Sequence, residues 1–145
     1  MITEFEIIGR VFLALLFGGL IGLEREINKE PAGLRTHMLV CLGSALFTVM
    51  SFEAAGQIGD PSRIAAGIVT GIGFLGAGMI FRDHDNVKGL TTAADLWVIA
   101  AVGMAVGFGY YTMALISTAL VLTVLTAKKV FVEGKKTKVN SKKGN

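Results

Sequence analysis

Eight polar residues at the ends of apolar segments could form one cluster that binds a cation or a proton at a membrane surface. Ionisable side chains at membrane depth are costly, and they usually pair with an opposite charge. We therefore expect Asp95 to pair with Arg25 or Arg82, and Glu24 to pair with Arg35. The predicted functional polar cluster consists of Glu24, Arg25, Arg35, Thr36, Arg82, Thr91, Thr92 and Asp95.

Asp95 is the member of this cluster that admits the most interpretations. Thr92 lies three residues before it, and this spacing is typical of a helix start, so the carboxylate could simply satisfy backbone N–H groups there. Asp95 also lies close to Trp97 in an apolar segment, where a carboxylate could bind a cation or a proton. Capping or ion pairing is the favoured interpretation. Ligand binding remains the alternative, with Mg²⁺ as the candidate ligand.

The sequence predicts neither a catalytic centre nor a transition-metal site. His84 lies between Asp83 and Asp85, but three consecutive loop residues rarely point at one metal ion. His37 has no companion at ligand spacing. No serine, cysteine or lysine has a recognisable general base as partner, so nucleophilic catalysis has no support. We expect a noncatalytic protein without a resident cofactor.

The composition indicates that membrane helices must position these residues. Of the 145 residues, 52% are hydrophobic and 17% are charged, and 19 are glycine. The longest uncharged runs are 18 residues between Arg63 and Arg82 and 32 residues between Asp95 and Lys128. A bilayer core of about 30 Å is crossed by about 20 helical residues. This composition excludes an intrinsically disordered chain and a disulfide-stapled secreted fold, and it disfavours a water-soluble enzyme.

The chain is predicted to be an all-α, polytopic membrane protein with five transmembrane helices. Thr3 and Glu6 form a capping-box pattern, and Asp60 followed by Pro61 is a typical helix start. The 32-residue run is too long for one helix, and we expect it to break at GFGYY, residues 107–111. The predicted helices span about residues 4–24, 36–53, 61–81, 91–107 and 110–127, and a lysine-rich tail follows at 128–145.

The distribution of charge predicts the orientation. The tail carries seven lysines and one glutamate, a net charge of +6, whereas the rest of the chain carries −3. Five crossings place 12 basic residues on the tail side, and Arg10 and Arg63 on the other. The positive-inside rule then predicts an N-terminus outside, a C-terminus inside and the polar cluster at the cytoplasmic face. A lysine tail without aromatic or arginine companions indicates contact with anionic lipid and not with nucleic acid.

Glycines at four-residue spacing are expected to let helices approach closely. Residues 71–76 read GIGFLG, which matches the dinucleotide-binding pattern GxGxxG, but they lie inside an uncharged apolar run and not after a strand. We interpret them as part of a packing face. From the glycine pairs we expect the first, third and fourth helices to form the packed centre, while the glycine-free fifth segment is peripheral or faces a partner. The predicted packing residues are Gly18, Gly22, Gly67, Gly71, Gly73, Gly76, Gly103 and Gly107.

Five ordered sequence blocks cover most of the chain up to about residue 127. They are GLERE (22–26), AGLRTHMLV (32–40), DPSRIAAG (60–67), GIGFLGAGMIF (71–81) and VKGLTTAADLWVIAAVGMAVGFG (87–109). Together they resemble the membrane domain of the MgtC/SapB family. The matching positions are Glu24 to Glu26, Arg35 and Thr36, Arg63, the glycines from 71 to 78, and Gly89 to Ala94 with Trp97. Asp95 departs from the family pattern, where this position is more often small or hydroxylated, and many members continue into a soluble C-terminal domain.

The resemblance implies a multi-pass protein of the bacterial inner membrane, from a family associated with growth or survival when magnesium is scarce and, in some pathogens, with virulence. The leading hypothesis is a noncatalytic regulator or adaptor linked to magnesium or ion homeostasis. Its expected partners are the lipid bilayer and another membrane protein or a second copy. The alternative is a cation transporter or channel for Mg²⁺. A transporter needs polar residues at the bilayer midplane, and the middles of the predicted helices are almost wholly apolar or glycine, which favours the regulator.

Overall fold

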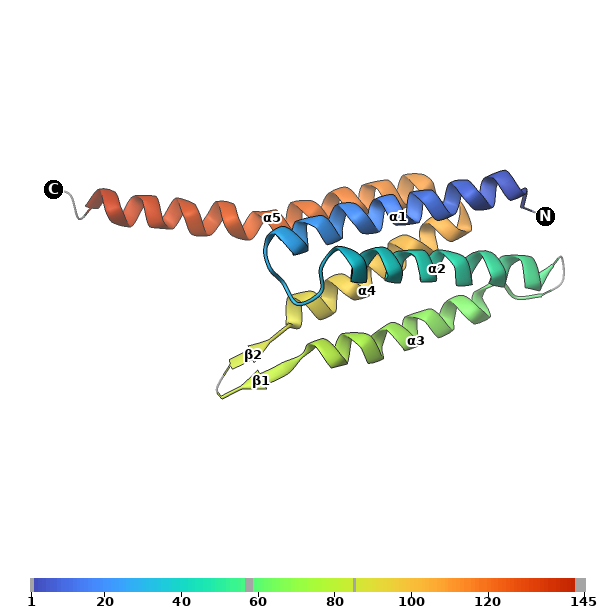
Figure 1. The fold of residues 1–145 in the computed structure, drawn as a ribbon, viewed down its shortest axis with the longest axis horizontal. Helices are drawn as coiled ribbons and strands as arrows, with labels where there is room; N and C mark the ends of the chain where they lie inside the picture. Colours follow the sequence, from blue (N-terminus) through green and yellow to red (C-terminus); the bar gives the residue numbers. More distant parts are fainter. Residues whose placement is uncertain (1, 57–58, 85, 143–145) are drawn as a thin grey trace.

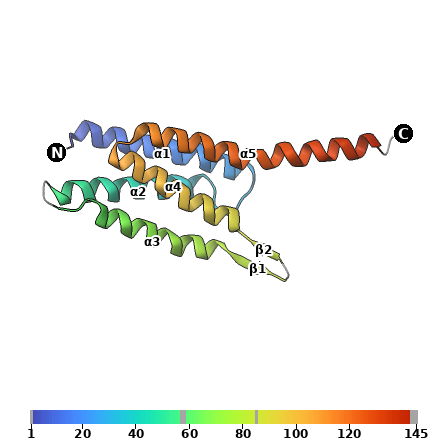
Figure 2. The same cartoon turned by 180° about the vertical axis from the view of Figure 1, so that it is seen from behind.

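The computed structural model describes residues 2–56, 59–84 and 86–142, with side chains as far as residue 127. The five expected helices are present, and they alternate in direction along the chain (Figures 1 and 2). Within the described residues the only strands are those of a short antiparallel hairpin, which joins the third helix to the fourth. The elements are α1 (Glu4–Ile27), α2 (Leu34–Ala55), α3 (Ser62–Met79), β1 (Phe81–Asp83), β2 (Asn86–Lys88), α4 (Leu90–Phe108) and α5 (Tyr111–Lys142).

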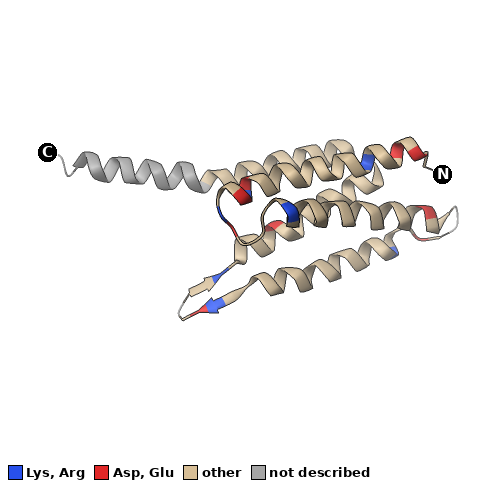
Figure 3. Ribbon diagram, in the orientation of Figure 1, with Lys and Arg blue, Asp and Glu red and all other residues tan. Residues whose placement is uncertain are grey.

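Helices α1 to α4 are each long and apolar enough to cross a bilayer. The first part of α5, Tyr111–Ala127, is a shorter apolar helix. Large apolar side chains cover the outside of the bundle, as Phe12 and Phe74 do, which are 67% and 82% exposed. The charged side chains gather at the two ends of the bundle (Figure 3). An apolar outer surface between charged ends is the pattern that a bilayer requires.

Local sequence signals set several helix ends. Thr3 and Glu6 form the predicted capping box, in which the Glu6 backbone N–H donates to Thr3 Oγ1 at 3.3 Å and the Thr3 N–H donates to Glu6 Oε2 at 2.9 Å. The predicted break of the long apolar run is confirmed, because α4 ends at Phe108 and Gly109 adopts a positive φ of 84°. Asp60 accepts a hydrogen bond from the Ser62 N–H at 2.9 Å, and α3 begins at Ser62.

Two helix ends differ from the predicted ones. The third helix was expected to reach residue 81, but α3 ends at Met79 and Phe81 pairs with Lys88 in the hairpin. The chain reverses here through His84, which adopts a positive φ of 53°. The backbone of α5 continues as a helix to Lys142, beyond the expected end at 127. Asp85 and the side chains of the predicted lysine-rich tail lie outside the described residues.

The packed centre consists of α1, α2 and α4, so the predicted centre of first, third and fourth helices is wrong. Glycines of α1 and α4 both face α2. A Cβ atom on Gly18 would lie 2.8 Å from the His37 carbonyl oxygen, and one on Gly107 would lie 2.6 Å from Thr48 Cβ. Gly22 and Gly103 approach α2 equally closely. The two helices can approach α2 because its facing side chains are small, as in Cys41 and Ser44.

Helix α3 lies at the edge of the bundle, and only Ala65, Ile72 and Gly76 of this helix are buried. A Cβ atom on Gly67, Gly71 or Gly73 would have nothing within 4 Å, and one on Gly76 would lie 3.6 Å from the Ala93 carbonyl oxygen. Three of the four glycines predicted to pack in this helix therefore make no close helix contact within the chain. The GxGxxG segment is continuous α-helix, which is not the loop that binds a dinucleotide.

Candidate functional site

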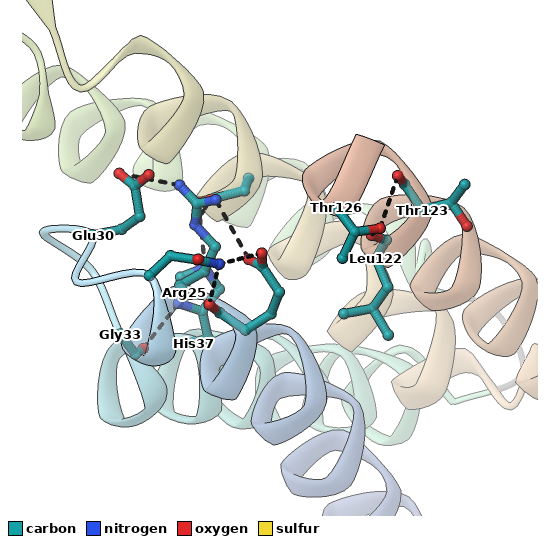
Figure 4. Close-up of polar contacts among 10 residues, drawn as sticks. Arg25, Glu30, Gly33, His37, Leu122, Thr123 and Thr126 are labelled. Carbon is teal, nitrogen blue, oxygen red and sulfur yellow. Dashed lines mark hydrogen bonds and ion pairs between the residues drawn. The ribbon is translucent and has the colours of Figure 1, made fainter. Parts of the chain in front are cut away.

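The buried guanidinium of Arg25, near the end of α1, organises the polar residues at one end of the bundle. Its side chain is 4% exposed, and its Nε atom lies 2.9 Å from Asp95 Oδ2 on α4. Nη1 lies 3.5 Å from Glu24 Oε2 and Nη2 lies 3.3 Å from Glu30 Oε2 (Figure 4). Of the two partners that the sequence left open for Asp95, the structure has Arg25 and not Arg82.

His37 on α2 contacts the other oxygen of Asp95. The ring is completely buried, its Nε2 atom lies 3.3 Å from Asp95 Oδ1, and its Nδ1 atom lies 2.9 Å from the Gly33 carbonyl oxygen (Figure 4). A carbonyl oxygen only accepts hydrogen bonds, so Nδ1 must carry a hydrogen. The contact at Nε2 is then a hydrogen bond only when one proton lies between the ring and the carboxyl group, on either side. The site therefore has the geometry to hold one exchangeable proton.

The ion pair between Arg25 and Asp95 is close but not aligned as a hydrogen bond. Although the two atoms lie 2.9 Å apart, Arg25 Nε, Arg25 Nη2 and Asp95 Oδ2 have no hydrogen-bond partner within the described part of the chain. The contact is therefore mainly coulombic. Its strength depends on exclusion of water, which the 4% and 3% exposure of the two side chains indicates.

Glu24 pairs with neighbours on its own helix, so its predicted pairing with Arg35 is wrong. The Asn28 amide donates to the Glu24 carboxylate, and also to the Glu24 backbone carbonyl oxygen at 2.7 Å. The Glu24 side chain is 10% exposed. Arg35 is exposed in the first turn of α2, where its side chain faces away from Glu24 and makes no ion pair with a described residue.

The remaining predicted residues separate into a buried and an exposed group. Thr92 is 1% exposed on α4, one turn before Asp95, and Thr36 is half-buried. Thr91 is exposed, and Arg82 in the hairpin donates from Nε to the His84 carbonyl oxygen at 3.1 Å. The predicted cluster of eight is thus reduced to Glu24, Arg25 and Asp95 with Thr92 beside them.

The capping interpretation of Asp95 is wrong. Helix α4 begins at Leu90, its N-cap residue is Gly89, and no side chain caps it. Asp95 lies more than one turn inside the helix and points to α1 and α2. The helix begins at Leu90 because Gly89 can adopt the positive φ of 85° found there.

Sequence reasoning missed His37 and Glu30. His37 occurs four residues after Gly33, the spacing at which a side chain can reach a backbone oxygen one helical turn back. Its neighbours along α2 are apolar, and a lone histidine in an apolar helix needs a buried polar partner. That requirement was a usable signal for a contact with Asp95. Glu30 lies in the loop after α1, and no periodic pattern indicates which way a loop residue points.

The arrangement joins three helices through one balanced set of charges. Arg25 comes from α1, His37 from α2 and Asp95 from α4. Within the described residues there is no group of three or more His, Cys, Asp or Glu side chains placed to hold a metal ion. The chemistry that these contacts support is charge pairing and exchange of a proton between His37 and Asp95.

Comparison with known proteins places these residues within a family. The family model described as the MgtC family matches residues 11–133. The chain is 47% identical over 127 residues to a protein of Escherichia coli K12 named "Putative magnesium transporter YhiD", and the alignment covers 83% of this chain and 59% of that protein.

Two relatives named protein MgtC are similarly close. The one from Brucella abortus (strain 2308) is 50% identical over 111 residues, which cover 77% of this chain and 46% of that protein. The one from Salmonella typhimurium (strain LT2) is 47% identical over 118 residues, which cover 81% of this chain and 50% of that protein. The chain thus spans about half the length of the curated relatives it matches. No solved structure matches the chain at comparable significance.

Proposed function

Because the chain belongs to the MgtC family and is a multi-pass membrane protein linked to magnesium homeostasis, we propose that it acts as a noncatalytic regulator or adaptor of another membrane protein. We place it in the bacterial inner membrane, with its N-terminus outside and its C-terminus inside. The polar cluster then lies at the cytoplasmic face, and its role is to hold α1, α2 and α4 in one arrangement that a partner recognises.

The observation that carries this proposal is the pairing of Asp95. This carboxylate is almost completely buried, and it contacts the Arg25 guanidinium on one oxygen and His37 on the other. A divalent cation would have to displace the guanidinium, because two cationic groups cannot share one carboxylate oxygen without strong repulsion. The pairing therefore supports a structural role more than a step on an ion pathway.

A cation transporter is the second candidate, and one feature of the cluster favours it. Three carboxylates, those of Glu24, Glu30 and Asp95, lie within 3.5 Å of a single guanidinium. An excess of acidic groups at the end of a helix bundle is what a cation entry site needs. The name of the E. coli relative, "Putative magnesium transporter YhiD", points the same way.

Flux measurement separates the two candidates. The purified chain would be reconstituted in liposomes that contain a fluorescent magnesium indicator, and a Mg²⁺ gradient would be applied from outside. We expect uptake equal to that of protein-free liposomes. Gradient-driven uptake that is lost in the Asp95→Asn variant would overturn the regulator proposal in favour of transport.

A partner search tests the regulator directly. A photo-crosslinking residue in place of Phe74, which is 82% exposed on α3, would be activated in native membranes. We expect one membrane protein to be recovered repeatedly, and to disappear when Arg25→Met or Asp95→Asn disturbs the cluster. Recovery of lipid alone from positions on every helix would count against an adaptor. A tag at residue 145 that is reached from outside intact cells would contradict the proposed orientation.

A further inference from the structure

An apolar groove of about 620 Å³ separates α2 from α3, and the polar cluster does not use it. Its walls are Leu39, Gly43 and Phe47 on α2, and Ile64, Gly67 and Leu75 among others on α3. The two helices diverge here because the glycines leave space that no side chain fills, and a Cβ atom on Gly43 or Gly67 would meet nothing within 4 Å. In a bilayer such a space is occupied by an apolar group.

We propose that this groove binds one acyl chain of an anionic phospholipid, with the phosphate held by Arg35 and Arg82. The proposal is independent of whether the protein regulates a partner or conducts a cation.

The length of the groove fits a lipid chain from a single leaflet. The lining residues of α2 run from Leu39 to Phe47, about 12 Å at 1.5 Å per residue. Those of α3 run from Ile64 to Leu75, about 17 Å on the same basis. Half of a bilayer core is about 15 Å. A partner's transmembrane helix would need a contact surface along about twice this length.

The charge at one end of the groove fits a phosphate. Arg35, Leu39, Gly43 and Phe47 follow one another at four-residue spacing, so Arg35 lies on the same face of α2, one turn beyond the groove. Its side chain is exposed and makes no ion pair with a described residue. Because α3 runs antiparallel to α2, Arg82 follows the end of α3 that lies beside the start of α2 (Figure 1). Arginine presents several N–H donors to a phosphate, and its long side chain can extend to the headgroup level.

The same charges disfavour a second copy as the occupant. Two copies in one membrane with the same orientation would meet through the same surface on each, related by a twofold axis. The Arg35 and Arg82 side chains of both copies would then be brought together at one end of the contact. Like charges in an interface oppose association, whereas an anionic lipid neutralises them.

Native mass spectrometry of the delipidated full chain tests the proposal, with phosphatidylglycerol and phosphatidylcholine of identical acyl chains as probes. We expect preferential binding of phosphatidylglycerol. Arg35→Gln should weaken that binding about fivefold, and Arg35→Gln with Arg82→Gln about 25-fold, because a basic residue near a lipid surface contributes about 1 kcal/mol. Phosphatidylcholine binding should not change. Arg63→Gln is the matched control, since Arg63 lies at the opposite end of α3.

Filling the groove tests the acyl-chain part separately. Gly67→Leu should weaken the binding of both lipids, whereas Gly73→Leu should not, because Gly73 is on the same helix, equally free of contacts and outside the groove lining. Helix content by circular dichroism confirms that both variants fold. Equal binding of the two lipids by the wild-type chain, or no effect of Gly67→Leu, would overturn the proposal. A dimer that Gly67→Leu dissociates would overturn it in favour of a second copy.

Discussion

Replacement of Asp95 by Asn would leave the buried Arg25 guanidinium without its nearest counter-charge. Removal of one partner of a buried ion pair typically costs about 3–5 kcal/mol of unfolding free energy. Two other carboxylates remain near Arg25, those of Glu24 at 3.5 Å and Glu30 at 3.3 Å, and their side chains are 10% and 35% exposed. We therefore expect Asp95→Asn to cost about 3 kcal/mol, at the lower end of that range.

The reciprocal change, Arg25→Met, removes the cation and leaves Asp95 with His37 as its contact. It also leaves Glu24 without a cation, so we expect a cost of about 3–4 kcal/mol. When both residues are changed, no uncompensated charge remains between α1 and α4, and an apolar side chain fills part of the space. Buried ion pairs replaced by uncharged groups often lose little stability. The double variant should therefore be more stable than the sum of the single changes predicts, by about 2 kcal/mol.

Equilibrium unfolding in mixed detergent micelles, followed by circular dichroism, measures all four proteins of this cycle. The control is Lys88→Gln in the hairpin, where the Lys88–Asp83 ion pair is about half exposed and should have no measurable effect on unfolding. Additive effects of the two buried substitutions, within about 0.5 kcal/mol, would refute an interaction between Arg25 and Asp95 in the folded protein.

Two further predictions concern packing and titration. Gly107→Ala should destabilise the protein by about 1–3 kcal/mol because its Cβ atom would lie 2.6 Å from Thr48 Cβ, whereas Gly71→Ala should not; the same unfolding assay measures both, and equal effects would contradict the described packing. Donation from Lys88 holds the pKa of Asp83 below its ordinary value, so this contact stabilises the hairpin above about pH 4 and is lost as the pH falls through the lowered pKa. NMR titration should find that Lys88→Gln raises the pKa of Asp83, and an unchanged pKa would exclude the contact.

Hydropathy and local signals were enough to predict most of the fold. Long uncharged runs can satisfy their backbone only as helices in lipid, so the number of helices followed from the positions of charged residues. The capping box at Thr3 and the break at Gly109 depend on neighbours within four residues, and such contacts can be recognised along the chain. The hairpin after α3 could not, because its strands have three residues each and no apolar alternation.

The arrangement of the helices was harder to predict, because glycine spacing marks a surface without identifying its partner. The pairs in α1 and α4 are matched by a stripe of small residues on α2, which consists of Cys41, Ser44, Ala45 and Thr48. A search for small residues of all kinds, and not for glycine alone, would have found α2. The glycines of α3 have the same spacing and face open space.

The candidate site was half predictable for a related reason. The rule that buried charges pair correctly indicated Arg25 as a partner for Asp95. The rule could not distinguish Arg35 from other cations for Glu24, because that choice depends on which side of α2 faces α1. The contact of His37 with Asp95 joins positions 58 residues apart, and only the packing of α2 between α1 and α4 brings them together.

The contrast between the tight centre and the loose α3 has a mechanical consequence. Backbone atoms of α1, α2 and α4 meet across glycines, so these three helices resist sliding and rotation as a rigid frame. Helix α3 is held by few buried side chains and has a groove on the side of α2, so it is the most compliant element of the frame. The hairpin links it directly to the start of α4, less than two helical turns before Asp95. A lateral load on α3 from the surrounding membrane would therefore be transmitted to the buried charges by this short lever.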